Sequence, residues 1–171
     1  VTQQDAIEFL QKQATNTFDI ISAFHFVEHI SFSDLQKLVQ ESLRVLRPAG
    51  LLIMETPNPD NLAVGTSGFY SDPTHKQPIP SSLLAFLPEY YGYARQKVFG
   101  LQEPQAVHED QKIKLEDVLF HASPDYAVVA QSPGEPEQLA ALDEVFAVEK
   151  GIGLRKLVHQ FDRNMAGFQN Q

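Results

Sequence analysis

Residues 18–55 read FDIISAFHFVEHISFSDLQKLVQESLRVLRPAGLLIME, and they determine the fold of this chain. The stretch opens with residues 18–24, which are almost entirely β-branched, aromatic or small and so predict a strand buried on both faces. Apolar residues then repeat at helical spacing over 35–46, until a proline and a glycine end the pattern. Residues 51–55 form a second apolar run. The order strand, helix, strand predicts a crossover unit with two parallel strands.

Two helix starts carry capping signals. Asp5 precedes apolar residues at helical spacing, so it predicts the N-cap of a short amphipathic helix over 5–13. Ser33 followed by Gln36 forms a capping box, and we therefore expect the crossover helix to be capped at Ser33.

The segment after the second strand, residues 56–80, is rich in proline, asparagine, glycine and aspartate. It predicts a loop much longer than most connections, and long ordered loops usually carry function. Ser81 or Ser82 can cap the next helix, which Pro88 would kink or shorten. Further strands are predicted over 96–101 and 126–130, and a short helix over 115–120.

The C-terminal part begins with a proline and glycine linker over 132–136, and helical patterns follow over 139–148 and 154–168. One face of the last pattern is apolar: Leu154, Leu157, Val158, Phe161, Met165 and Phe168. This stripe needs cover, either within the chain or from a coiled coil with a neighbouring chain. We predict a domain over 1–131 and a helical appendage over 132–171.

The composition excludes several classes of function. The chain has 13 Lys and Arg against 22 Asp and Glu, a formal net charge of -9, which repels a nucleic acid backbone. It has no cysteine, so disulfides, thiolate metal sites and cysteine nucleophiles are excluded. No apolar run approaches the roughly 20 residues that cross a bilayer. We expect a cytoplasmic protein with no nucleic-acid partner and no membrane span.

Two stretches, SAFHFVEHI at 22–30 and RVLRPAGLLIMETPNP at 44–59, resemble class I S-adenosylmethionine-dependent methyltransferases. The resemblance extends from residue 5 to about residue 130. It implies an α/β fold with a partial Rossmann-like sheet, mainly parallel with an antiparallel last strand, followed by C-terminal helices. Ala49 departs from the family, which more often has glycine there, and we expect a negative φ at this position because alanine is accepted.

The resemblance also implies a cofactor, S-adenosylmethionine, at the carboxyl ends of the parallel strands. Asp5 would accept a hydrogen bond from the adenine amino group, and the backbone of Ala6 would contact the adenine ring. Phe24, His25 and Phe26 would line the methionine side. The alternatives are that Asp5 only caps a helix and that the two phenylalanines belong to the core.

The loop phrase GFYSDPTHKQPIP at 68–80 resembles the acceptor-side insertion of methyltransferases of bacterial surface-polysaccharide and lipopolysaccharide biosynthesis. It implies a saccharide, phosphosaccharide or other small-molecule acceptor. His75 is the candidate catalytic base, and Tyr70 and Asp72 are candidate acceptor contacts. His29 and Asn58 are further candidates for substrate binding. The alternative is a turn held by its own side-chain hydrogen bonds.

The string His25-Phe-Val-Glu28-His29 also matches H-x-x-E-H, the zinc-binding motif of one class of hydrolases. That interpretation requires a helix through His25. The strand predicted before His25 and the helix start predicted after His29 disfavour it, and we expect no resident metal.

The third alternative is an assembly module without catalysis. The glycine-rich turn and the acidic ribose ligand of a methyltransferase would precede Val1, so we expect 1–171 alone to bind the cofactor weakly or not at all. The only Gly-x-Gly, at 151–153, is expected to be a helix breaker. An apolar edge at 18–24 would then lie open, which predicts pairing with another chain, as in a homo-oligomer.

Overall fold

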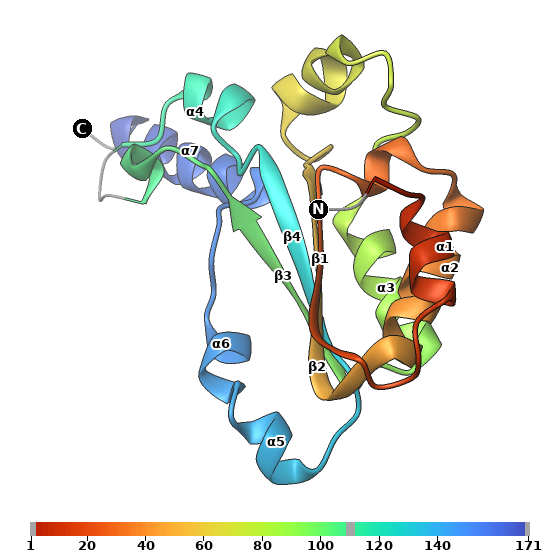
Figure 1. The fold of residues 1–171 in the computed structure, drawn as a ribbon. Helices are drawn as coiled ribbons and strands as arrows, with labels where there is room; N and C mark the ends of the chain where they lie inside the picture. The colour runs from red at the N-terminus through yellow and green to blue at the C-terminus, as the bar shows by residue number, and fades with distance from the viewer. Residues whose placement is uncertain (1–2, 109–111, 170–171) are drawn as a thin grey trace.

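The computed structural model describes residues 3–108 and 112–169. Within these residues one sheet holds β1 (Phe18–Phe24), β2 (Leu46–Pro57), β3 (Arg95–Leu101) and β4 (Asp125–Gln131), in the spatial order β1-β2-β4-β3 (Figure 1). β1 and β2 are parallel, and β4 is antiparallel to both of its neighbours, so β1, β2 and β3 share one direction. The predicted Rossmann-like sheet with an antiparallel last strand is confirmed.

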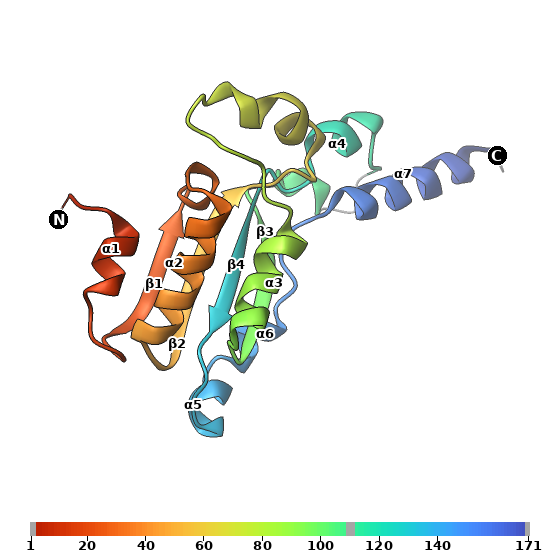
Figure 2. The same cartoon turned by 90° about the vertical axis from the view of Figure 1, so that its right-hand side faces the viewer.

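Three helices lie on one face of this sheet. The crossover helix α2 (Phe32–Val45) joins β1 to β2, and α1 (Ala6–Gln11) and α3 (Ser81–Tyr91) lie on either side of it (Figure 2). Alternate residues of a strand point to opposite faces. Leu52 and Met54 of β2 point toward the helices and are fully buried. The predicted crossover unit is therefore present.

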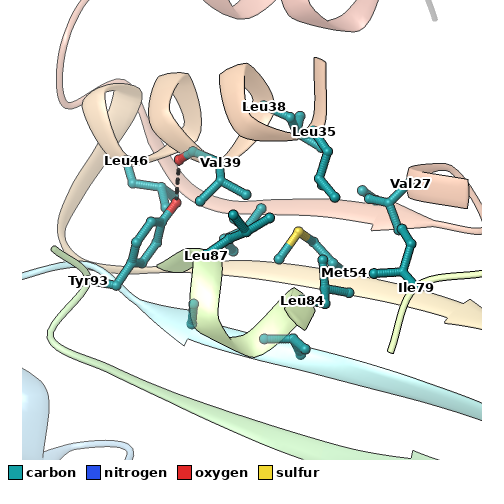
Figure 3. Close-up of a cluster of buried hydrophobic side chains, with 14 of the residues drawn as sticks. Val27, Leu35, Leu38, Val39, Leu46, Met54, Ile79, Leu84, Leu87 and Tyr93 are labelled. Atoms are coloured by element: carbon teal, nitrogen blue, oxygen red, sulfur yellow. Dashed lines mark hydrogen bonds between the residues drawn. The ribbon is translucent and has the colours of Figure 1, made fainter. Parts of the chain in front are cut away.

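Apolar side chains from α2, α3 and β2 meet in the main core (Figure 3). Leu38, Leu84 and Leu87 are buried there, and burying each leucine stabilises the fold by about 1.5–3 kcal/mol. Tyr93 donates a hydrogen bond of 3.1 Å from its hydroxyl to the carbonyl oxygen of Val39. Burial raises the pKa of Tyr93 well above its ordinary value. This core fixes the crossover helix against the sheet.

The predicted N-cap is confirmed for α1 and wrong for α2. Asp5 caps α1, because its carboxylate accepts a hydrogen bond of 2.9 Å from the backbone N–H of Glu8. In α2 the cap is Ser31, whose hydroxyl accepts from the backbone N–H of Asp34 at 3.1 Å. The prediction of Ser33 was wrong, because the chain is already helical from Phe32.

Helix α3 begins and ends differently from the prediction. Its N-cap is Pro80, and Ser81 is the first helical residue, so neither predicted serine is the cap. Pro88 lies inside the helix, which continues to Tyr91. Gly92 ends it with a φ of +94°, a left-handed conformation that glycine adopts without steric cost.

The first part of β2, where its register with β1 shifts, also differs from expectation. Ala49 has a φ of +61°, so the predicted negative φ was wrong. The segment after β4 fixes this backbone conformation. The N–H of Ala49 donates to the carbonyl oxygen of Pro133 at 3.0 Å, and its carbonyl accepts from the Gln131 side chain at 3.1 Å. The alanine is held in a left-handed conformation that costs roughly 1–2 kcal/mol.

Strand β1 is exposed on one face, so the prediction of a strand buried on both faces was wrong. Ala23 points toward the helices and is only 7% exposed, whereas Ile20 and Phe24 are each 58% exposed. In the described part of the chain β1 pairs with β2 alone. An edge strand with helices on one face leaves its other apolar side chains in water.

The C-terminal helices are α4 (Leu115–Phe120), α5 (Pro136–Ala140), α6 (Asp143–Ala147) and α7 (Leu154–Gln169). Helix α4 lies where the sequence predicts it. In place of the single helix predicted over 139–148 there are two short helices. The chain leaves the helical conformation at Leu142, which has a φ of -115° and a ψ of 12°. No helix in the described residues has both the length and the apolar character that a membrane crossing requires.

The apolar stripe of α7 is partly covered within the chain. Leu157 is fully buried in a second core cluster beside Ile113 and Val118. Leu154, Val158 and Phe161 pack against this cluster. Met165 is 50% exposed, and the side chain of Phe168 lies outside the described residues. This cluster joins residues on both sides of position 131, and the division at that position stays a prediction.

Candidate functional site

The carboxyl ends of β1 and β2 lie side by side. Phe24 pairs with Glu55, and the backbone N–H of His25 donates to the carbonyl oxygen of Glu55 at 2.9 Å. His25 has a φ of +46°, a conformation that is uncommon outside glycine and that ends the strand. One 3₁₀ turn, Val27–His29, follows. No helix runs through His25, so the geometry that the H-x-x-E-H interpretation requires is absent.

The 3₁₀ turn places a carboxylate in the interior. Glu28 is fully buried, and its Oε2 accepts a hydrogen bond of 2.8 Å from the hydroxyl of Thr56 in β2. Its Oε1 lies 3.3 Å from Nδ1 of His25 and 4.0 Å from Nε2 of His29. Among the described residues Oε1 has no hydrogen-bond partner. A buried carboxylate oxygen without a donor is costly, so this atom marks a site.

The loop after β2 brings His75 to the same place. The rings of His29 and His75 lie 4.7 Å apart between centroids, and His75 also packs on Phe69 at 4.5 Å. Nδ1 of His75 is 2.6 Å from the carbonyl oxygen of Phe69. Each histidine offers a ring nitrogen within 4.8 Å of a carboxylate oxygen of Glu28. We call Glu28, His29 and His75 the histidine–carboxylate cluster.

The turn that carries His75 is held by internal hydrogen bonds, as the alternative interpretation expects. The backbone N–H and the hydroxyl of Thr74 both donate to Oδ1 of Asp72, at 2.8 and 2.6 Å. The hydrogen bond from the Thr74 side chain is the main reason that the pKa of Asp72 is lowered. Oγ1 of Thr74 also lies 2.9 Å from Nδ1 of His29. Tyr70, a predicted acceptor contact, is 64% exposed.

The start of the loop is fixed by two buried asparagines. Asn58 donates from its side chain to the carbonyl oxygen of Ser123 at 2.8 Å and accepts from the backbone N–H of Asp60. Asn61 donates to the carbonyl oxygen of Ala122 at 2.6 Å. These hydrogen bonds give Asn58 an anchoring role, and its predicted contact with substrate stays a prediction. Asn61 was not among the predicted residues, although its place in an asparagine- and proline-rich run is typical of a structured turn.

Of the predicted cofactor residues, four line two grooves, and His25 lies beside the histidine–carboxylate cluster. A groove of about 430 Å³ between α1 and β1 is lined by Ala6, Phe24 and Phe26, together with apolar residues of both elements. Asp5 borders a neighbouring groove of about 250 Å³, to which Phe26 also belongs. His25 instead lies between two carboxylates, with Nε2 3.6 Å from Oε1 of Glu55. The larger groove falls within the usual size of ligand pockets, about 300–1,000 Å³, and its aromatic lining fits an adenosyl group.

A second group of titratable residues lies beside His25. His25, Glu55 and Asp125 each offer a ligand atom within 4.8 Å of the others. Burial raises the pKa of Asp125, the neighbouring His25 partly offsets this, and the negative charges of Glu55 and Glu28 raise the pKa again. Glu55 and Asp125 were not among the predicted residues, because Glu55 joins His25 through the pairing of β1 with β2 and Asp125 through the pairing of β2 with β4.

Residues 1–54 match the model of the methyltransferase domain family. No curated protein matches the chain. The chain is similar to the crystal structure of a SAM-dependent methyltransferase from Archaeoglobus fulgidus, at 28% identity and a TM-score of 0.68. That match covers 77% of this chain and 66% of the Archaeoglobus chain, just under two thirds of its length.

Two more distant structures show the fold alone. The YcgJ protein from Bacillus subtilis is 18% identical with a TM-score of 0.53, and the match covers 78% of this chain and 71% of that one. An S-adenosylmethionine-dependent methyltransferase from Mesorhizobium loti is 14% identical with a TM-score of 0.51, covering 71% and 66%. The fold is that of a Rossmann-like methyltransferase sheet, and the comparisons imply S-adenosylmethionine as the cofactor. They favour neither a hydrolase nor a module without catalysis.

Proposed function

We propose that this chain forms the acceptor side of an S-adenosylmethionine-dependent methyltransferase that acts in the cytoplasm on a hydroxyl of a saccharide or phosphosaccharide. The acceptors we favour belong to bacterial surface-polysaccharide or lipopolysaccharide biosynthesis. One observation supports the proposal most strongly. The parallel strand β1 ends at Phe24 beside Glu55, two residues before β2 ends at Pro57, and ligands of open α/β sheets bind beyond such ends.

The cofactor would lie along the groove between α1 and β1. S-adenosylmethionine supplies the methyl group when it is bound. Phe24 and Phe26 would pack against its apolar surface, and the backbone of Ala6 would contact the adenine ring. Asp5 is exposed and already accepts one hydrogen bond as a cap, and its second oxygen is the atom we assign to the adenine amino group.

The acceptor would lie over the loop that carries His75, between Tyr70 and Asp72, with His29 and Asn58 nearby. A carbonyl oxygen can only accept, so Nδ1 of His75 carries the proton that points at Phe69. Nε2 then holds a lone pair that can take the proton of an acceptor hydroxyl. Methyl transfer is an in-line displacement, so the main task of these residues is to align the hydroxyl.

Calorimetric titration with S-adenosylhomocysteine tests the cofactor site. Phe24→Ser should weaken binding about tenfold, because one aromatic contact of roughly 1.4 kcal/mol is lost. Phe120→Ser is the matched control, because Phe120 is 54% exposed on α4, outside the groove. The titration is repeated on a form extended at the N-terminus. Absence of binding in both forms contradicts the proposal.

Self-association through β1 or α7 is a separate part of the proposal. Its support is the exposure of Ile20 and Phe24 on an edge strand, which can pair with another chain. Sedimentation velocity over a range of concentrations should show association that Ile20→Lys reduces. Leu115→Lys is the control, because Leu115 is 56% exposed on α4, away from the edge. A monomer at every concentration contradicts this part.

A further inference from the structure

We infer that the histidine–carboxylate cluster binds one divalent cation, with Zn²⁺ as the best fit, through Oε1 of Glu28 and the Nε2 atoms of His29 and His75. This inference goes beyond the proposed function and does not depend on it. It rests on three independent features of the cluster: the orientation of two imidazoles, a buried carboxylate oxygen without a partner, and the type of ligands.

The first feature is that neighbouring groups fix the protonation pattern of both imidazoles. The carbonyl oxygen of Phe69 can only accept, so Nδ1 of His75 carries a proton. Thr74 donates its hydroxyl proton to Asp72, so its oxygen is left to accept from Nδ1 of His29. In the neutral form of each ring, the lone pair therefore lies on Nε2.

The second feature is the carboxylate. Oε2 of Glu28 has the hydroxyl of Thr56 as its donor, whereas Oε1 has no donor among the described residues. Nε2 of His29 is 4.0 Å from Oε1, which is too long for a hydrogen bond. Glu28 is fully buried, so water is a poor substitute. A divalent cation would satisfy Oε1 together with the two imidazole lone pairs, and Nδ1 of His25, 3.3 Å from Oε1, is the competing donor.

The third feature is the ligand set. Two histidines and one glutamate hold catalytic zinc in proteins, and a water or substrate takes the fourth position. Ligating histidines usually donate their other N–H to a carbonyl or carboxylate, as His75 does directly and His29 does through Thr74 and Asp72. Tetrahedral zinc with bonds near 2.1 Å places its ligands roughly 3.4 Å apart. One ligand atom of each residue lies within 4.8 Å of the other two, and Nε2 of the partly exposed His29 is 4.0 Å from Oε1 of Glu28, so zinc binding requires these side chains to move closer together.

The cluster differs from the H-x-x-E-H motif in one ligand. It uses Glu28 and His29, but His75 takes the place of His25. His25 faces Oε1 of Glu28 on one side and Glu55 on the other, which makes it a neighbour of the site. The lone pair on Nε2 of His75 can bind a cation or take a proton from an acceptor hydroxyl, but not both at once. The zinc site and the role of His75 as the base are therefore alternative assignments for this one atom.

Titration of the chelator-treated protein with Zn²⁺, followed by calorimetry, tests the inference. The expected result is one Zn²⁺ per chain. His29→Gln and His75→Gln should each lower the affinity more than tenfold, and Thr74→Val should lower it about 10–100-fold as loss of an outer partner. His121→Gln is the matched control, because this histidine pairs with Asp117 on α4 and should leave the affinity unchanged.

A second measurement separates coordination from a change in folding. Long-range ¹H–¹⁵N spectra of the imidazoles should show Nε2 of His29 and His75 shifting with added Zn²⁺, while the rings of His108 and His121 stay unchanged. Circular dichroism of each variant confirms that it is folded. The inference is wrong if Zn²⁺ does not bind, or if both His→Gln variants bind it as well as the original chain. Neither measurement uses S-adenosylmethionine, so failure of the methyltransferase proposal leaves this test intact.

Discussion

The hydroxyl of Thr56 donates a hydrogen bond of 2.8 Å to Oε2 of Glu28, and both residues are fully buried. This bond ties the turn after β1 to the end of β2. It therefore fixes the two strand ends on which the candidate site is built. It is also the one hydrogen bond that the structure gives the Glu28 carboxylate among the described residues.

Thr56→Val should destabilise the protein by about 2 kcal/mol, because a hydrogen bond to a buried charged group is lost while the volume is kept. Urea unfolding measures this change. Thr66→Val is the control, because the exposed Thr66 hydroxyl bonds only to the carbonyl of its own helical turn, at Leu62, and the change should be within about 0.5 kcal/mol. Equal effects of the two substitutions would contradict the assignment.

The cap of α2 gives a second prediction. Ser31→Ala should cost about 1 kcal/mol, because the backbone N–H of Asp34 loses its side-chain acceptor and keeps only the carbonyl oxygen of Ser31 at 3.0 Å. Ser33→Ala should change the stability by less than about 0.5 kcal/mol, because Ser33 is exposed and caps nothing. Thermal unfolding of both variants separates these outcomes, and the reverse order would restore Ser33 as the cap.

The left-handed conformation of Ala49 gives a third prediction. Ala49→Gly should stabilise the protein by up to about 1 kcal/mol, because relief of the strain exceeds the added entropy of the unfolded chain. Ala141 is exposed and has a φ of -56°, so Ala141→Gly should not stabilise. A loss of stability in Ala49→Gly, measured by urea unfolding, would argue against a positive φ at this position.

Asp125 gives a prediction about pH. Burial raises the pKa of its carboxyl above the ordinary value of 3.8, so the folded protein holds this proton more tightly than the unfolded chain. The contribution of Asp125 to stability is therefore full below 3.8 and is lost as the pH rises through the folded-state pKa. Asp125→Asn should gain stability relative to the original chain as the pH rises above 3.8. Parallel stability curves across this range would contradict the shift.

Local patterns predicted the elements that depend on neighbours in sequence. The seven residues of β1 and the helix α4 lie where periodicity and composition place them, and Asp5 caps α1 as predicted. Boundaries set by distant contacts were missed. The φ of Ala49 follows from hydrogen bonds with Gln131 and Pro133, which lie more than eighty residues away in the sequence.

The candidate site shows the same division. His75 was predicted because the sequence of its loop resembles that of known methyltransferases. Phe24 was predicted because it lies at the end of a strand. The contact of His75 with His29 depends on how the long loop folds back over the 3₁₀ turn, and no local pattern encodes that. Asp125 joins His25 only because β4 inserts between β2 and β3. Local signals therefore found candidate residues, while the tertiary fold decided which of them meet.

Residue-resolved NMR titration with S-adenosylhomocysteine tests most directly whether the groove beside β1 is the cofactor site. Amide ¹H–¹⁵N spectra detect even weak binding, with a Kd of about 1 mM. Shifts are expected to concentrate at Ala6 and over residues 24–26, with little change in β3 or α7. Spectra that do not change up to the solubility limit, or shifts confined to elements away from β1, would contradict the proposed site.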